Sequence, residues 1–116
     1  MSYVLTFWKY KKDQHQENHL EISEKCSDGE ILEELETLDT EGILNDICIM
    51  FSEWKTEDNE SFTSPDEKST FQIFYTSQFF RFDCYQVTGE NMNVFIDIFQ
   101  KDQCSLYDPQ TNKRYT

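Results

Sequence analysis

The two histidines of the chain, His15 and His19, stand four residues apart in the segment HQENH. Side chains at this spacing lie on one face of a helix, where two imidazoles can bind one metal ion. The segment is polar, however, and no glutamate directly follows the first histidine, as one does in the HExxH motif. We therefore interpret the histidines as a solvated pair and expect no metal site.

The four cysteines offer the next candidate chemistry. Cys26, Cys48, Cys84 and Cys104 are far apart, with no CxxC pair and no histidine at ligand spacing, so neither a zinc site nor a redox motif is indicated. Three of the four lie inside or beside apolar blocks of the sequence. We predict that they are reduced thiols that pack as small hydrophobic side chains.

Phosphate-binding and acid–base chemistry are not indicated either. The three glycines, Gly29, Gly42 and Gly89, each stand at or near an expected helix start, and no GxGxxG or Walker spacing is present. Carboxylate pairs are numerous, but an open acidic surface lacks the dry pocket that acid–base catalysis needs. We expect a protein that is not an enzyme and that uses no cofactor.

Charge is the most informative property of the sequence. Residues 13–67 contain eighteen Asp or Glu and two Lys, a net charge of −16, whereas the remainder has five acids and eight bases, a net charge of +3. The stretch SDGEILEELETLDTE, residues 27–41, has seven acids and no base. This regional asymmetry predicts an acidic interaction face. The alternative is a solvated surface that keeps the protein soluble.

The same charge argues against a nucleic-acid partner, because a chain with a net charge of −13 is repelled by phosphates. The basic residues outside the acidic region are too few to read a groove. The alternation of the first ten residues, followed by Lys11 and Lys12, leaves no apolar run long enough for a signal peptide or a membrane span. We expect a cytoplasmic protein without a membrane partner.

The chain is predicted to form one domain, residues 1–116. Its core should be rich in aromatic rings, because 16% of the residues are aromatic. SYVLTFWKY predicts a strand, and residues 19–26 predict a short helix. Residues 28–38 fit either a short helix or an extended acidic loop, with apolar anchors among the acids. A helix with Thr40 as N-cap should follow, and residues 55–69 predict a mobile acidic loop. The predicted apolar anchors of residues 28–38 are Ile31, Leu32, Leu35 and Leu38. The predicted apolar stripe of the following helix is Ile43, Ile47, Met50, Phe51 and Trp54.

The second half of the chain predicts two strands around Ser77 and Gln78, a helix capped by Thr88, and a hairpin that turns at residues 108–111. Arg81 and Asp83 fall on one face of a strand, where they are expected to form an ordinary pair. The inward-facing residues should be Phe71, Ile73, Tyr75, Phe80, Phe82, Cys84, Met92, Phe95, Ile96 and Phe99. The predicted fold is α+β, with two layers. A mainly antiparallel sheet of about four to five strands has two to three helices packed on one face.

The segments SYVLTFWKY, SDGE, FQIFYTSQFFRFDCY and SLYDPQTNKRY carry a resemblance. Together they resemble small acidic bacterial immunity proteins of contact-dependent inhibition and other polymorphic toxin systems. The resemblance implies a cytoplasmic protein that binds one cognate toxin domain, often a basic nuclease, and blocks its active site or a nearby surface. No individual binding residue follows from it.

The charge pattern itself selects the contact residues that such a function would use. An acidic face raises the encounter rate with a basic protein, and apolar anchors slow dissociation. Trp54 and Phe62 are candidate anchors, although the helical stripe favours the core for Trp54. The predicted partner-binding acids are Glu30, Glu33, Glu34, Glu36, Asp39, Glu41, Glu57, Asp58 and Glu60. Two alternatives remain open: an acidic phage-type inhibitor that mimics DNA, whose carboxylates should cover the whole surface, and a cytosolic adaptor domain without a toxin partner.

Overall fold

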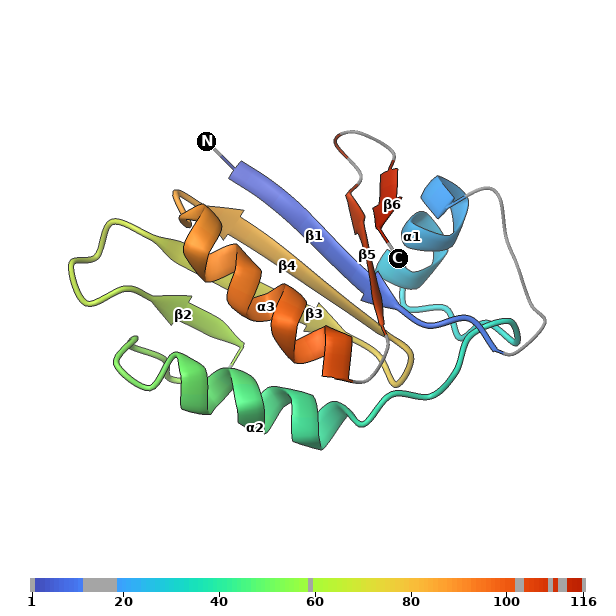
Figure 1. Cartoon of the computed structure of the whole chain (residues 1–116), viewed down its shortest axis with the longest axis horizontal. Coiled ribbons are helices and arrows are strands. Elements are labelled where there is room, and N and C mark those ends of the chain that lie inside the picture. The colour runs from blue at the N-terminus through green and yellow to red at the C-terminus, as the bar shows by residue number, and fades with distance from the viewer. Residues whose placement is uncertain are drawn as a thin grey trace.

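Six antiparallel strands form the sheet on which the helices are packed (Figure 1). The computed structural model describes residues 2–11, 19–58, 60–101, 104–108, 110 and 113–115. The strands are β1 (Ser2–Trp8), β2 (Ser61–Thr63), β3 (Thr70–Tyr75), β4 (Phe79–Tyr85), β5 (Ser105–Asp108) and β6 (Lys113–Tyr115), in the order β2-β3-β4-β1-β5-β6. The helices are α1 (His19–Ser27), α2 (Thr40–Met50) and α3 (Gly89–Lys101). The predicted α+β class, with a mainly antiparallel sheet, is confirmed.

The first strand occupies the middle of the sheet, between β4 and β5. Its residues alternate, so Leu5 and Phe7 point to one face while Thr6 and Trp8 point to the other. All four side chains are buried. Both faces of this strand are therefore covered, and each face needs its own layer.

The first layer consists of α2 and α3, which lie side by side across one face of the sheet (Figure 1). Their apolar stripes meet the rings of β1, β3 and β4. Phe99 stacks on Phe7 at a centroid distance of 4.0 Å, and Phe95 stacks on Phe82 at 4.3 Å. Thr88 caps α3 as predicted, since its hydroxyl accepts a hydrogen bond from the Asn91 N–H. The expectation of a core built from rings is confirmed.

The opposite face of the sheet is covered by α1, and this differs from the expectation that the helices share one face. Trp8 and Phe79 are large apolar side chains on the second face, and both are completely buried. Ile22 and Cys26 of α1 pack against them together with Leu35 and Tyr107. The helix lies here because these rings would otherwise face water.

Residues 55–69 were predicted to form one mobile loop, but they contain the strand β2. The strand pairs with β3, and the Phe62 ring stacks on Phe71 at a centroid distance of 4.8 Å. Phe62 is therefore part of the core, with 2% of its surface exposed, and its predicted role as a surface anchor is wrong. A three-residue strand with one apolar residue leaves no periodic pattern in a polar sequence.

The boundaries of α2 also differ in detail from those expected. The N-cap is Asp39, not Thr40, and its carboxylate accepts a hydrogen bond from the Gly42 N–H. The helix ends at Met50, which is exposed rather than inward-facing. Trp54 lies beyond the helix and packs half-buried on Phe51, so its interpretation as a core residue holds.

The C-terminal hairpin is present as β5 and β6, with Tyr107 opposite Arg114. Two of the four residues of its predicted turn, Pro109 and Thr111, lie outside the described part of the chain. Within the described residues, none of the three helices has the length and apolar character needed to cross a bilayer.

The ring packing on β3 gives a test of the core. Phe71 contacts the rings of Phe51, Phe62 and Phe95, and it is completely buried. We expect Phe71→Ala to lower the free energy of unfolding by about 3 to 5 kcal/mol, measured by urea denaturation. The matched control is Phe74→Ala on the same strand, because 39% of the surface of Phe74 is exposed and about 1 kcal/mol or less should be lost. Equal losses in the two variants would contradict this assignment of the core.

Candidate protein-binding surface

Residues 28–39, called here the acidic segment, form an ordered loop between α1 and α2. Of the two conformations that the sequence permits, the extended loop is therefore the observed one. Gly29 follows the end of α1, rather than beginning a helix, and has a φ of +87° that favours glycine. Its N–H and that of Glu30 donate to the carbonyls of Cys26 and Lys25, which closes the last turn of α1.

Two leucines fasten the acidic segment to the core. Leu35 is completely buried among the rings of the second face, and Leu38 is buried against the core formed by α2 and α3. The segment therefore contacts both apolar clusters. Leu32 is half-buried, but Ile31 is 62% exposed and does not act as the anchor that the sequence predicted.

A single buried amide holds the backbone of the acidic segment against the turn between β3 and β4. The Gln78 side chain accepts a hydrogen bond from the Leu32 N–H at 2.8 Å, and donates to the carbonyls of Leu32 at 2.7 Å and Leu35 at 3.1 Å. The neighbouring Ser77 carbonyl accepts from the Leu38 N–H at 2.7 Å. Gln78 was predicted only as a turn residue, since nothing local in the sequence shows that its partners lie more than forty residues away.

The residues that follow β1 provide a third attachment. The Glu36 N–H donates to the Lys9 carbonyl, and the Lys11 N–H donates to the Glu34 carbonyl, each at 2.8 Å. The Lys9 ammonium also forms an ion pair with the Glu36 carboxylate at 3.1 Å. The acidic segment is thus held beside the residues that follow β1, and Tyr10 and Leu35 form a β-bridge there.

These attachments leave most of the predicted contact acids at the surface of this end of the molecule. Glu30, Glu33 and Glu41 are exposed, and Glu34 is half-buried. Among the described residues, none of these four carboxylates forms an ion pair. Glu36 and Asp39 have local partners instead, because Glu36 pairs with Lys9 and Asp39 caps α2.

The charges of the acidic segment act on its neighbours in α1. The pKa of the Lys25 ammonium is raised, mainly by its hydrogen bond and ion pair with Glu21 and further by Glu30 and Glu34. Burial, with the same two carboxylates, raises the pKa of the Cys26 thiol to about 12. This thiol therefore stays protonated at neutral pH, as expected for a cysteine that serves as a small hydrophobic residue.

The remaining predicted contact acids, Glu57, Asp58 and Glu60, lie at the other end of α2. Figure 1 shows the acidic segment where α2 begins and the chain around residue 58 beyond its end. The eleven residues of α2 span about 16 Å, so the two groups of acids are separated by the length of this helix. The Asp58 carboxylate accepts hydrogen bonds from the N–H groups of Glu60 and Ser61, which lower its pKa and shape the entry to β2.

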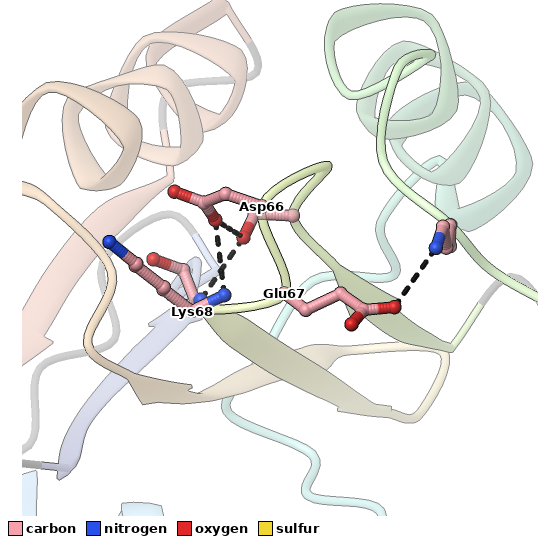
Figure 2. A network of polar contacts seen from close by, with 6 residues as sticks. Asp66, Glu67 and Lys68 are labelled. Carbon is pink, nitrogen blue, oxygen red and sulfur yellow. Dashed lines mark hydrogen bonds and ion pairs between the residues drawn. The ribbon is translucent and has the colours of Figure 1, made fainter.

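The loop between β2 and β3 is a separate polar network (Figure 2). The Asp66 carboxylate accepts hydrogen bonds from the Ser64 hydroxyl at 2.5 Å and the Lys68 N–H at 3.0 Å. Glu67 pairs with Lys55 across the loop at 3.0 Å. The hydroxyl of Ser64, followed by the backbone of Lys68, lowers the pKa of Asp66. This network stabilises a turn and points no group toward a shared site.

Of the two histidines predicted to be a solvated pair, His15 lies outside the described residues. His19 begins α1, and its Nδ1 is hydrogen-bonded to the Tyr10 hydroxyl at 2.9 Å. No three His, Cys, Asp or Glu of the described ranges are grouped as metal ligands would be.

Arg81 and Asp83 form the expected pair, with Nε and Oδ1 3.0 Å apart.

No family model matches this chain, and a search of curated proteins gave no significant match.

The role of Gln78 can be tested directly. Gln78→Ala leaves the polar groups of Leu32 and Leu35 without this partner, so we expect a loss of about 2 kcal/mol or more in the free energy of unfolding. Amide exchange at Leu32 and Leu38 should also become faster. The control is Gln72→Ala, an exposed glutamine on β3, with a change of about 0.5 kcal/mol or less. Unchanged exchange in the Gln78 variant would show that the leucines alone hold the acidic segment.

The lowered pKa of Asp66 predicts a pH dependence. A carboxyl group whose pKa is lower in the folded state stabilises the fold above its ordinary pKa of 3.8, and the benefit disappears as the pH falls through the lowered value. We therefore expect Asp66→Asn to be less stable than the wild type at neutral pH, and the difference to shrink in acid. Urea denaturation across this pH range measures it.

The same comparison in a Ser64→Ala background is the control for Asp66. This substitution removes the largest cause of the shift, so the pH-dependent part of the difference should become smaller. A difference between wild type and Asp66→Asn that does not vary with pH would contradict the assignment.

Proposed function

We propose that the acidic segment is a docking surface for a basic protein. The observation that carries this proposal is the attachment of the segment through Gln78, whose three hydrogen bonds fix the backbone between Leu32 and Leu35. A charged loop that is held in one conformation loses little conformational entropy on binding. The exposed carboxylates of Glu30 and Glu33 are therefore presented without a large ordering cost, and that of Glu41 is carried by the first turn of α2.

An apolar anchor within this surface supports the proposal. Ile31 has 62% of its surface exposed and lies in sequence between the acids Glu30 and Glu33. Interfaces commonly combine a buried apolar centre with a polar rim. Ile31 takes the place that the sequence had suggested for Phe62, and it can slow dissociation while the carboxylates accelerate encounter.

The class of partner we propose is a toxin domain, most simply a basic nuclease, which the protein neutralises as an immunity protein in the cytoplasm. Two features support this class: the net charge of −16 in residues 13–67, and the resemblance of the sequence to immunity proteins of polymorphic toxin systems. The adaptor alternative uses the same surface but has a partner that is not toxic.

Capture from the native host separates these possibilities. The full-length protein is immobilised, retained proteins are identified at about physiological salt, and each is expressed alone in a host that lacks this protein. We expect a basic partner that stops growth alone and is tolerated when this protein is co-expressed. A harmless partner would refute the immunity function, and the absence of any retained basic protein would refute the docking surface itself.

Charge reversal tests which acids meet the partner. The double variant Glu30→Lys/Glu33→Lys should bind the captured partner with an association rate roughly tenfold lower at low salt, because the local field is reversed. The matched control is Glu57→Lys/Glu60→Lys, which changes the net charge equally at the other end of α2. Its rate should fall by less than about threefold. Equal effects of the two variants would show that overall charge, rather than the acidic segment, directs association.

A further inference from the structure

A groove of about 210 Å³ lies between α2 and α3, the two helices that run side by side in the first layer (Figure 1). This volume is below the range of about 300 to 1,000 Å³ that is usual for small-molecule sites, so the groove is better suited to side chains of another protein. The lining residues on which the inference depends are Asp46, Ile49 and Met50 of α2, and Val94, Asp97 and Lys101 of α3.

The helix α2 carries apolar residues on more sides than the sheet covers. Seven of the nine residues from Ile43 to Phe51 are apolar. Ile43 and Ile47 are buried in the core, whereas Ile49 has 61% and Met50 has 58% of its surface exposed. A helix that is apolar on all sides is normally buried, and isolated exposed apolar residues are normally scattered. The adjacent pair that lines this groove therefore marks a side of α2 that a partner covers.

The charges of the groove favour a basic occupant. Asp46 lines it from α2 and Asp97 from α3, and among the described residues neither carboxylate forms an ion pair. Lys101 is the one base among the described lining residues. The last turn of α2, which ends at Met50, has no basic residue to offset the negative end of the helix dipole. A second copy of this chain is disfavoured, because two molecules with a net charge of −13 repel each other.

We propose that this groove receives an amphipathic helix of a partner protein, with an apolar stripe flanked by lysine or arginine. The stripe packs on Ile49, Met50 and Val94, and the bases pair with Asp46 and Asp97. A helix suits this site because it satisfies its own backbone groups, whereas an added strand needs the open edge of a sheet. The groove uses no residue of the acidic segment, so the inference does not rest on the proposed function.

The probe is a capped synthetic peptide of about fifteen residues, with leucines at the i, i+3, i+4 and i+7 spacing and with lysine and alanine elsewhere. It is titrated into the full-length protein and followed by amide chemical shifts. We expect saturable shifts at Asp46, Ile49, Val94 and Asp97. Two control peptides should each bind at least about tenfold more weakly: one has glutamate in place of lysine, and the other has the same composition without the apolar stripe.

Two double variants test the two kinds of contact. Ile49→Gln/Met50→Gln should weaken binding of the lysine peptide by at least about tenfold, because it removes the apolar contact and keeps residues that favour a helix. Asp46→Asn/Asp97→Asn should weaken binding by about fivefold and make it less dependent on salt.

The matched controls are Leu20→Gln and Glu90→Gln. Leu20 is an aliphatic residue on α1 with 44% of its surface exposed, and Glu90 lies on the exposed first turn of α3. Both variants should bind the lysine peptide as the wild type does. Urea denaturation checks that all variants are folded, and the control peptides decide the question on the wild-type protein even where a variant is destabilised.

Four results would overturn this assignment. They are the absence of saturable shifts, equal binding of the glutamate peptide, equal binding of the peptide without a stripe, and shifts confined to residues 28–39. Shifts of the groove residues that depend on protein concentration, without any peptide, would show instead that a second copy occupies the groove. The outcome is distinguishable from that of the proposed function. If no basic partner is captured but the lysine peptide binds at Ile49, the groove stands and the docking role of the acidic segment is refuted.

Discussion

The alternation of large apolar side chains on β1 and β4 is the constraint from which the rest of the structure follows. Phe7 and Phe82 require cover on one face of the sheet, while Trp8 and Phe79 require it on the other. The helices α2 and α3 satisfy the first requirement and α1 satisfies the second. The acidic segment connects α1 on one face to α2 on the other, and Leu35 and Leu38 are therefore buried in the two apolar clusters. These contacts hold the backbone that carries the acidic side chains.

This arrangement has an electrostatic cost. Like charges that are held close together repel each other, and only Glu36 and Asp39 of the acidic segment have local partners. The repulsion is tolerated because the attachments to Gln78 and to the apolar clusters are made by backbone groups and leucines, which do not depend on the carboxylates. Attachment and surface charge are therefore supplied mainly by different residues of the same segment, the leucines and the acids.

The elements that could be predicted from the sequence are those whose residue pattern is periodic and local. The alternating strands around Gln78, the stripe of α3 and its Thr88 cap were all predictable from spacing alone. What could not be predicted depends on contacts between distant segments. The hydrogen bonds of Gln78, the face on which α1 packs and the burial of Phe62 in a three-residue strand follow from tertiary packing, which leaves no local pattern. The separation of the acids to the two ends of α2 likewise could not be read from the sequence, because a list of charges does not show where each lies in space.

The position of β1 in the middle of the sheet has a consequence for the synthesis of the protein. One of its neighbours is β5, and the Thr6 hydroxyl bonds the Tyr107 carbonyl across a separation of 101 residues. The second apolar cluster, which buries Leu35 of the acidic segment, also includes Tyr107. On the ribosome, the first strand must wait for β5 to emerge before both of its edges are paired. Leu35 therefore meets all of its buried neighbours only after translation has passed this strand, so the packing of the acidic segment should be completed late in synthesis.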